Sequence, residues 1–91
     1  MKGKGELQMK MKVLGIQKNC RFKIDGQEHI GLNLYVGRED DQVEGLATEK
    51  QFINVNKGTL YASASMLKPD DQIEVVYNRF GKFESITPIK G

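Results

Sequence analysis

Residues 29–37, HIGLNLYVG, decide the fold. Every second residue of this stretch is apolar, namely Ile30, Leu32, Leu34 and Val36. Side chains of a β-strand point to opposite faces with a period of two residues, so this spacing predicts a half-buried strand whose apolar residues face inward. The same phase places Asn33 and Tyr35 on the outer face.

A second stretch, residues 49–56 (EKQFINVN), shows the same alternation. Ile53 and Val55 take the inward phase. The outward positions are Lys50, Phe52 and Asn54. A small protein seldom exposes aromatic rings beside lysines unless something flat binds there, and bases of single-stranded nucleic acid are the leading candidate, because each base offers a π face. The alternative is that a second layer or a second subunit covers these rings.

The segment before this strand also alternates, but its phase changes. Apolar residues occupy alternate positions from Leu7 to Val13, and the apolar phase then moves to Leu14 and Ile16. A change of phase inside one strand predicts a β-bulge or a sharp bend near residues 13–15.

Two turns are expected between this segment and residue 29. Lys18-Asn19 is predicted to turn the chain, and Asp25-Gly26 is a strong signal for a tight hairpin turn. Phe22 and Ile24 would form a short strand between the two turns. Because they share one phase, Phe22 is predicted to face the core rather than a ligand.

Residues 59–67 (TLYASASML) form the one predicted helix. Thr59 is a suitable N-cap, and one face of the helix is apolar at Leu60, Ala64 and Leu67. Residues 72–77 and 82–89 then predict two strands joined by a short loop that ends in Gly81. Pro88 has no backbone N–H to donate, so the last strand is expected to lie at a sheet edge or to end near residue 87.

This order of elements predicts a mainly β protein. We expect a small five-stranded barrel like the oligonucleotide/oligosaccharide-binding (OB) fold, with one short helix between the third and fourth barrel strands, because a bent first strand can serve two parts of a sheet and close it. An SH3-like barrel is the alternative. Residues 1–8 are expected to be a flexible segment, and residues 9–91 a single OB-like domain.

Composition argues against several classes of site. The single cysteine, Cys20, allows no disulfide framework or cysteine-rich metal site and fits a reducing cytoplasm. His29 is the only histidine and lacks partners for a triad or a metal site. No apolar run reaches the ~20 residues that span a bilayer. We therefore expect a cytoplasmic protein with no enzymatic activity, no cofactor, no metal and no membrane association.

Charge is distributed unevenly along the chain, although the formal net charge is only +2. Residues 1–24 carry seven Lys/Arg against one acid, whereas residues 25–49 carry seven acids against one arginine. A basic first segment suits a polyanion groove. The acidic residues 39–44 are compatible with such a groove if they form a protruding hairpin tip that points away from it.

Ten residues are candidates for nucleic-acid binding. They combine a basic stripe on the first segment, the outward residues of the two alternating strands and the aromatic–cationic loop of residues 79–83. The set is Lys10, Lys12, Lys18, Arg21, Tyr35, Lys50, Phe52, Arg79, Phe80 and Lys82. Phe83 belongs to the same loop, and core and contact roles are equally open for it.

The layout resembles the filamentous-phage single-stranded-DNA-binding proteins, which are small dimeric OB-fold proteins that coat single strands cooperatively. The resemblance covers most of residues 11–89 and is sharpest at residues 71–89, DQIEVVYNRFGKFESITPI, with its Phe-Gly turn. It implies that Phe80 packs toward nucleic acid bound by a neighbouring dimer and that Tyr35 contacts bases. By the same resemblance, phosphate contacts would come from Lys18 and Arg21. Similar small OB proteins occur on mobile elements of Gram-positive bacteria.

The residues and the resemblance together predict a homodimer that binds single-stranded DNA with little sequence preference, during replication or transfer of a phage or mobile element. RNA stays open as the ligand, because that choice depends on contacts to the 2′-hydroxyl group. The alternative function is a protein-interaction or assembly module that uses the same outward aromatic residues as a subunit interface.

Overall fold

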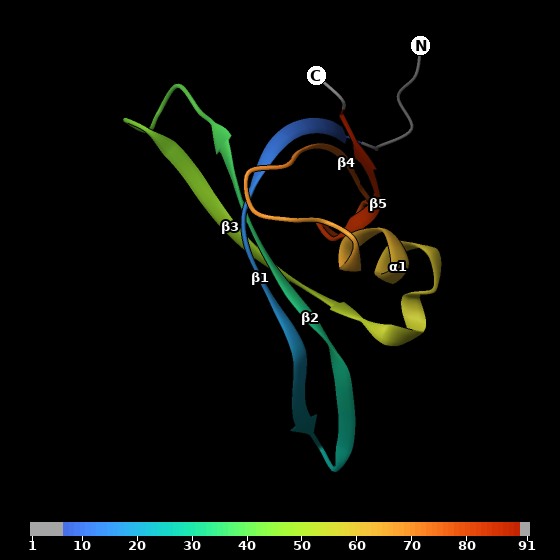
Figure 1. Cartoon of the computed structure of the whole chain (residues 1–91). Helices are drawn as coiled ribbons and strands as arrows, with labels where there is room; N and C mark the ends of the chain where they lie inside the picture. The colour runs from blue at the N-terminus through green and yellow to red at the C-terminus, as the bar shows by residue number, and fades with distance from the viewer. Residues whose placement is uncertain (1–6, 90–91) are drawn as a thin grey trace.

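One antiparallel sheet organises the computed structural model, which describes residues 7–89. Its five strands lie in the spatial order β3-β2-β1-β4-β5 (Figure 1). A 3-10 turn η1 (Val55–Lys57) and a helix α1 (Thr59–Ser65) connect β3 to β4. The strands are β1 (Leu7–Ile24), β2 (Gln27–Glu39), β3 (Leu46–Asn54), β4 (Gln72–Tyr77) and β5 (Phe83–Pro88). The predicted mainly β fold, with one short helix between the third and fourth strands, is confirmed. The segment expected to be flexible covered residues 1–8. Residues 7 and 8 lie in β1, and residues 1–6 lie outside the described residues.

β1 is long and bent, and it pairs with two different strands. Its first half pairs with β4 over residues 7–12, and its second half pairs with β2 from Lys12 to Ile24. The register of the β1–β2 pair shifts between Val13 and Gly15. This bulge confirms the change of phase predicted there, and it leaves Leu14 exposed beside the buried Val13.

The turn predicted at Lys18-Asn19 is wrong, because β1 continues through these residues. The register instead shifts between Gln17 and Cys20, with Asn19 at a φ of 59°. Asparagine tolerates this left-handed conformation better than most residues do. Since one extra residue moves the following side chains to the opposite face, Phe22 points outward and is 40% exposed. The prediction of a core position for Phe22 is therefore also wrong.

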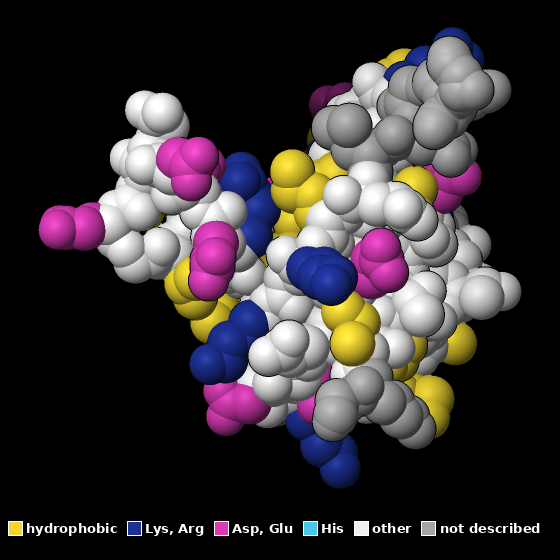
Figure 2. Space-filling model, turned by 90° about the horizontal axis from the view of Figure 1, so that it is seen from above, with side chains coloured by type: hydrophobic (Ala, Val, Ile, Leu, Met, Phe, Trp, Pro, Cys, Tyr) yellow, Lys and Arg dark blue, Asp and Glu magenta, His cyan; other side chains and the backbone are white. Residues whose placement is uncertain are grey.

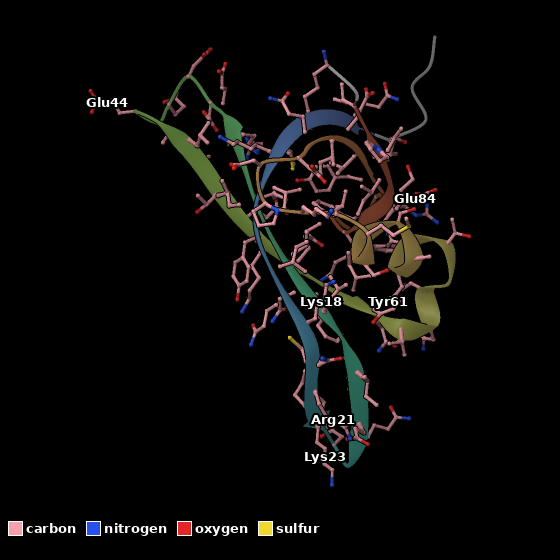
Figure 3. All side chains as sticks on the ribbon, viewed as in Figure 1. Lys18, Arg21, Lys23, Glu44, Tyr61 and Glu84 are labelled. Atoms are coloured by element: carbon pink, nitrogen blue, oxygen red, sulfur yellow. The ribbon has the colours of Figure 1, made fainter. Side chains whose placement is uncertain are left out.

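Two hairpins project from opposite ends of the molecule. The β1–β2 hairpin turns at Asp25 and Gly26, whose φ angles of 50° and 78° are those of the predicted tight turn. Its tip carries Arg21 and Lys23, whereas the acidic β2–β3 hairpin carries Glu44 at the other end (Figure 3). Glu44 thus lies on a protruding tip, which is the arrangement under which the acidic residues are compatible with a basic groove elsewhere.

The inward faces of β2 and β3 lie on a single core. Leu32, Leu34 and Val36 are buried, which confirms the phase of β2. The other members of the core come from every strand and from the helix region: Met11, Val13, Ile53, Ala64, Leu67, Ile73, Val75, Phe83 and Ile86. The inward position predicted for Val55 is wrong, because β3 ends at Asn54 and Val55 is exposed in η1.

Helix α1 packs against the core between β3 and β5. The predicted apolar face is confirmed, since Ala64 and Leu67 are buried and Leu60 packs against them. Thr59 is not the N-cap: Gly58 occupies that position, and no side chain caps the helix.

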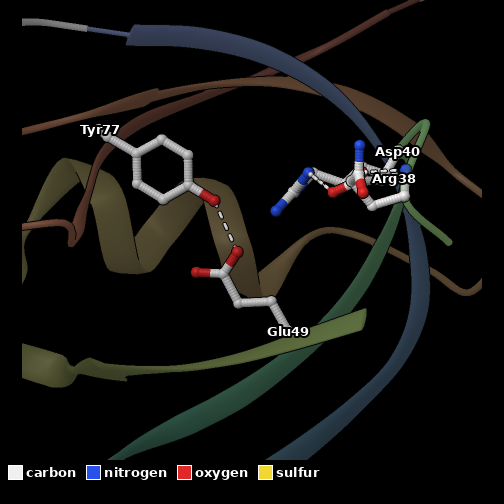
Figure 4. A network of polar contacts seen from close by, with 5 residues as sticks. Arg38, Asp40, Glu49 and Tyr77 are labelled. Atoms are coloured by element: carbon white, nitrogen blue, oxygen red, sulfur yellow. Dashed lines mark hydrogen bonds and ion pairs between the residues drawn. The ribbon is translucent and has the colours of Figure 1, made fainter. Parts of the chain in front are cut away.

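The sheet does not close into a barrel by a backbone ladder. β3 and β5 are its two edges, and the predicted closure of the OB-like barrel is thus not established. β5 lies at an edge, as Pro88 predicted. Side chains span the gap instead: Tyr77 Oη of β4 donates a hydrogen bond of 2.6 Å to Glu49 Oε1 of β3 (Figure 4).

Candidate nucleic-acid interface

The outer face of β2 and β3 presents the aromatic residues predicted from the sequence. The register places Tyr35 opposite Lys50 and Asn33 opposite Phe52. Tyr35 is 37% exposed and Phe52 is half-buried. The two rings therefore lie on neighbouring strands of one face, and Lys50 lies on β3 opposite Tyr35.

Hydrogen bonds hold Tyr35 in place on this face. Its Oη donates to Gln17 Oε1 at 3.3 Å, and Asn33 Nδ2 donates to the same oxygen at 3.2 Å. The ring lies beside Gly15 at the first bulge of β1. A ring fixed in this way loses little conformational entropy when a ligand stacks on it.

Phe22 and His29 extend the aromatic surface, and sequence analysis missed both. Phe22 stacks on His29 with ring centroids 5.3 Å apart and meets Phe52 edge-on at 4.9 Å. The signal was present in Lys18-Asn19, because asparagine serves a bulge with positive φ as readily as it serves a turn. We call Phe22, His29 and Phe52 the aromatic row.

A hollow of about 470 Å³ adjoins the aromatic row along the free edge of β3. The η1–α1 segment and the β4–β5 loop form its other walls. Of the predicted site residues, Phe52, Phe80 and Lys82 meet here. The remaining lining residues are Phe22, His29, Gln51, Ile53, Asn54, Lys57, Leu60, Asn78 and Phe83. Among the described residues, this lining holds two lysines and no carboxylate, so it suits an aromatic anion.

The β4–β5 loop presents Phe80 at the rim of the hollow. Asn78 Oδ1 accepts hydrogen bonds from the backbone N–H groups of Phe80 (2.8 Å) and Lys82 (3.1 Å), which fixes the loop. Phe80 is 76% exposed, and the guanidinium of Arg79 lies 5.5 Å from its ring centre. Phe83 is buried in the core and also forms part of the wall of the hollow.

Hydrogen-bonded polar side chains lie next to the hollow, between β3 and β4. The carboxylate of Glu49 accepts hydrogen bonds from Tyr77 and from Gln51 Nε2, each at 2.6 Å. Burial, and then the hydrogen bond to Glu49, raise the pKa of Tyr77 well above its ordinary value. Tyr77 is thus a neutral donor at physiological pH, and it ties β4 to β3.

The predicted basic residues do not form one stripe. Lys10 and Lys12 line a second hollow together with Arg38, at the far end of β2. At a strand rise of about 3.3 Å per residue, this hollow lies roughly 30 Å from the aromatic row. Figure 2 shows basic side chains in the notch beside the projecting acidic hairpin. Lys18 and Arg21 lie on the β1–β2 hairpin, where Arg21 pairs with Glu28 at 3.0 Å.

Comparisons with protein-family models, curated proteins and solved structures found no match. The resemblance to the phage proteins therefore stays a prediction. Within residues 7–89, no three His, Cys, Asp or Glu side chains are grouped so that they could hold a metal ion. No helix in that part of the chain has the length and apolar character needed to cross a membrane.

Proposed function

We propose that this protein binds single-stranded DNA with little sequence preference, along the outer face of β2 and β3 and in the hollow beside β3. The observation that carries the proposal is the continuity of the aromatic row with the hollow. Phe22, His29 and Phe52 adjoin a cavity whose rim carries Phe80. Unstacked bases can use each of these π faces, whereas duplex DNA keeps its bases stacked on one another.

The charges near the aromatic residues support a polyanionic ligand. Lys50 lies opposite Tyr35, and Lys57 and Lys82 line the hollow. Neither Lys57 nor Lys82 forms an ion pair within the described part of the chain. Glu44 of the acidic tip lies at the end of the molecule opposite the tip of the β1–β2 hairpin (Figure 3). Lysines attract phosphate without reading sequence, which is consistent with low sequence preference.

The biological role follows from the resemblance to the phage family. A phage or mobile-element protein of this size would coat or protect single strands during replication or transfer, as a homodimer. RNA is a second possible ligand, since aromatic stacking does not distinguish it from DNA.

Fluorescence anisotropy with a labelled oligo-dT at two salt concentrations tests the proposal. We expect binding at low salt that weakens steeply as salt increases, because phosphate contacts release counterions. Phe80→Ala should weaken binding. Met66→Ala is the matched control, since Met66 is 78% exposed and lies outside the lining of the hollow. An absence of binding at low salt would rule out the function.

A second candidate function, a subunit or partner interface, rests on exposed apolar residues of the outer face. Leu14, Tyr35 and Leu46 are all exposed. The two leucine side chains lie over Gly37, and a Cβ added to this glycine would be 3.1 Å from a methyl carbon of each leucine. The double substitution Tyr35→Ala, Phe52→Ala separates the functions. Loss of an oligomer in light scattering with unchanged DNA binding would favour the interface.

A further inference from the structure

We propose that the hollow beside β3 takes one base of the bound strand by its Watson–Crick edge, between the side-chain amides of Gln51 and Asn78. This inference rests on the proposed function and adds hydrogen bonding to the stacking argued above. It predicts that the site recognises an unpaired base, and not merely a flat ring.

The amide of Gln51 is oriented by its neighbours. Its Nε2 donates to Glu49 Oε2 at 2.6 Å and to the backbone carbonyl of Gly81 at 3.4 Å. Both partners are acceptors, so the nitrogen must face them, and Oε1 is left as an acceptor. Gln51 is only 9% exposed and lines the hollow. No described residue donates to Oε1, and no fully buried side-chain polar atom among the described residues lacks a partner, so Oε1 keeps some exposed surface on a residue that lines the hollow.

Asn78 supplies the complementary group. Its Oδ1 accepts from the backbone N–H groups of Phe80 and Lys82, which fixes the direction of the amide. Nδ2 is then left as a donor, and no described residue accepts from it. Asn78 lines the same hollow as Gln51. The lining of the hollow therefore includes one amide whose oxygen has no described donor and one amide whose nitrogen has no described acceptor.

This pair matches the Watson–Crick edge of a base. In thymine, N3–H can donate to Gln51 Oε1, and a ring carbonyl oxygen can accept from Asn78 Nδ2. The volume of about 470 Å³ lies within the range of about 300–1,000 Å³ that small-molecule sites occupy. Phe52 and Phe80 offer ring faces, and Lys57 and Lys82 can meet the flanking phosphates. In a duplex this edge is already paired, so such a site rejects double strands.

A chemically modified ligand separates edge recognition from stacking. An oligonucleotide of N3-methylthymidine keeps the base rings and the phosphate charges of oligo-dT, but its bases have no N3–H. We expect an oligonucleotide of about eight N3-methylthymidines to bind roughly tenfold or more weakly than unmodified oligo-dT, because one hydrogen bond is lost and Gln51 is left unpaired. Equal affinities for the two ligands would overturn the inference while leaving the proposed function intact. Failure to bind unmodified oligo-dT would overturn the proposed function itself.

A variant then assigns the effect to Gln51. Gln51→Met keeps the volume but removes the acceptor, so the difference between the two ligands should disappear. Gln72→Met is the matched control, because Gln72 is an exposed glutamine that lines the other hollow, and the difference should persist in it. A difference that survives Gln51→Met would overturn the assignment. If this variant does not fold, NMR of the unaltered protein decides: the side-chain amide signals of Gln51 and Asn78 should shift with oligo-dT and not with its methylated form, and unmoved signals with bound oligo-dT would refute it.

Discussion

Phe22 of β1 meets Phe52 of β3 edge-on, with ring centroids 4.9 Å apart and ring planes at 69°, across the intervening strand β2. The contact joins residues 30 positions apart, because the second bulge of β1 turns Phe22 to the outer face. Gly31 of β2 pairs with Cys20 on one side and with Asn54 on the other, and a Cβ there would overlap the backbone carbonyl oxygen of Ile53 in β3. The aromatic row therefore depends on the second bulge of β1, and the close approach of β2 to β3 depends on Gly31.

Removal of the Phe22 ring should lower the affinity for single-stranded DNA by more free energy than it takes from the stability of the fold. Phe22→Ala deletes one stacking surface worth about 1–3 kcal/mol per base, whereas a side chain 40% exposed contributes less to the core. Ile24→Ala is the control on the same strand, because Ile24 lies outside the lining of the hollow. Oligo-dT titration measures the first effect, and urea unfolding measures the second. Equal affinity of the two variants would contradict a contact role for Phe22.

Gly31→Ala should destabilise the fold. A methyl group at this position would overlap the backbone carbonyl oxygen of Ile53, and a backbone atom cannot move aside as a side chain can. We expect a loss of about 1–3 kcal/mol or more in the free energy of unfolding, typical of overpacking. Gly26→Ala tests a different cause, since nothing lies near its Cβ position and only its φ of 78° opposes the change. Chemical denaturation compares them, and a Gly31→Ala protein as stable as the parent would refute the close approach.

Tyr77→Phe should change how stability depends on alkaline pH. Burial and the Glu49 hydrogen bond raise the pKa of Tyr77 above its ordinary value of about 10, so the unfolded chain loses this proton first as pH rises. The contribution of Tyr77 is therefore fully present below about pH 10 and declines above it. Denaturation midpoints of the two proteins from pH 8 to 11 test this, and their difference isolates Tyr77 because every other titratable group is shared. A constant difference would contradict the raised pKa.

Lys82→Gln should lower affinity for single strands of any sequence and flatten the dependence on salt. Each phosphate contact contributes about −0.7 to the slope of log K against log salt for single strands, so one lost contact should reduce the slope by about that amount. Lys68→Gln is the control, since Lys68 is exposed but lies outside the hollow. A slope identical to that of the parent would place Lys82 away from phosphate.

The inward face of β2 was predictable because its alternation is uninterrupted over four apolar positions. Only part of the aromatic row was predictable, because the outward position of Phe52 was predicted but the outward position of Phe22 was not. One extra residue at Lys18-Asn19 reverses every later side chain of β1, and the local sequence of such a bulge is the same as that of a turn. Phe22 and Ile24 thus show one shared phase in the sequence, but the bulge decides which face that phase takes.

The hollow was predictable only in part, since Phe52, Phe80 and Lys82 were candidates for one site but the rest of its lining was not. Phe52, Asn78 and Phe80 meet only because the β4–β5 loop returns to the edge of β3, and no local pattern encodes that return. Val55 shows the related limit at an element end. It continues the alternation of β3, yet η1 begins at Val55 and turns its side chain outward.

No backbone ladder joins the edge strands β3 and β5, so the distance between these two strands is not fixed by backbone hydrogen bonds. A backbone ladder would fix the spacing of two strands at ~4.8 Å, whatever their side chains. Here hydrogen bonds of Tyr77, Glu49 and Gln51 link β3 to β4 and to the β4–β5 loop, outside the four strand pairings. We therefore expect substitutions at these three positions to change the opening of the hollow without a change in strand pairing.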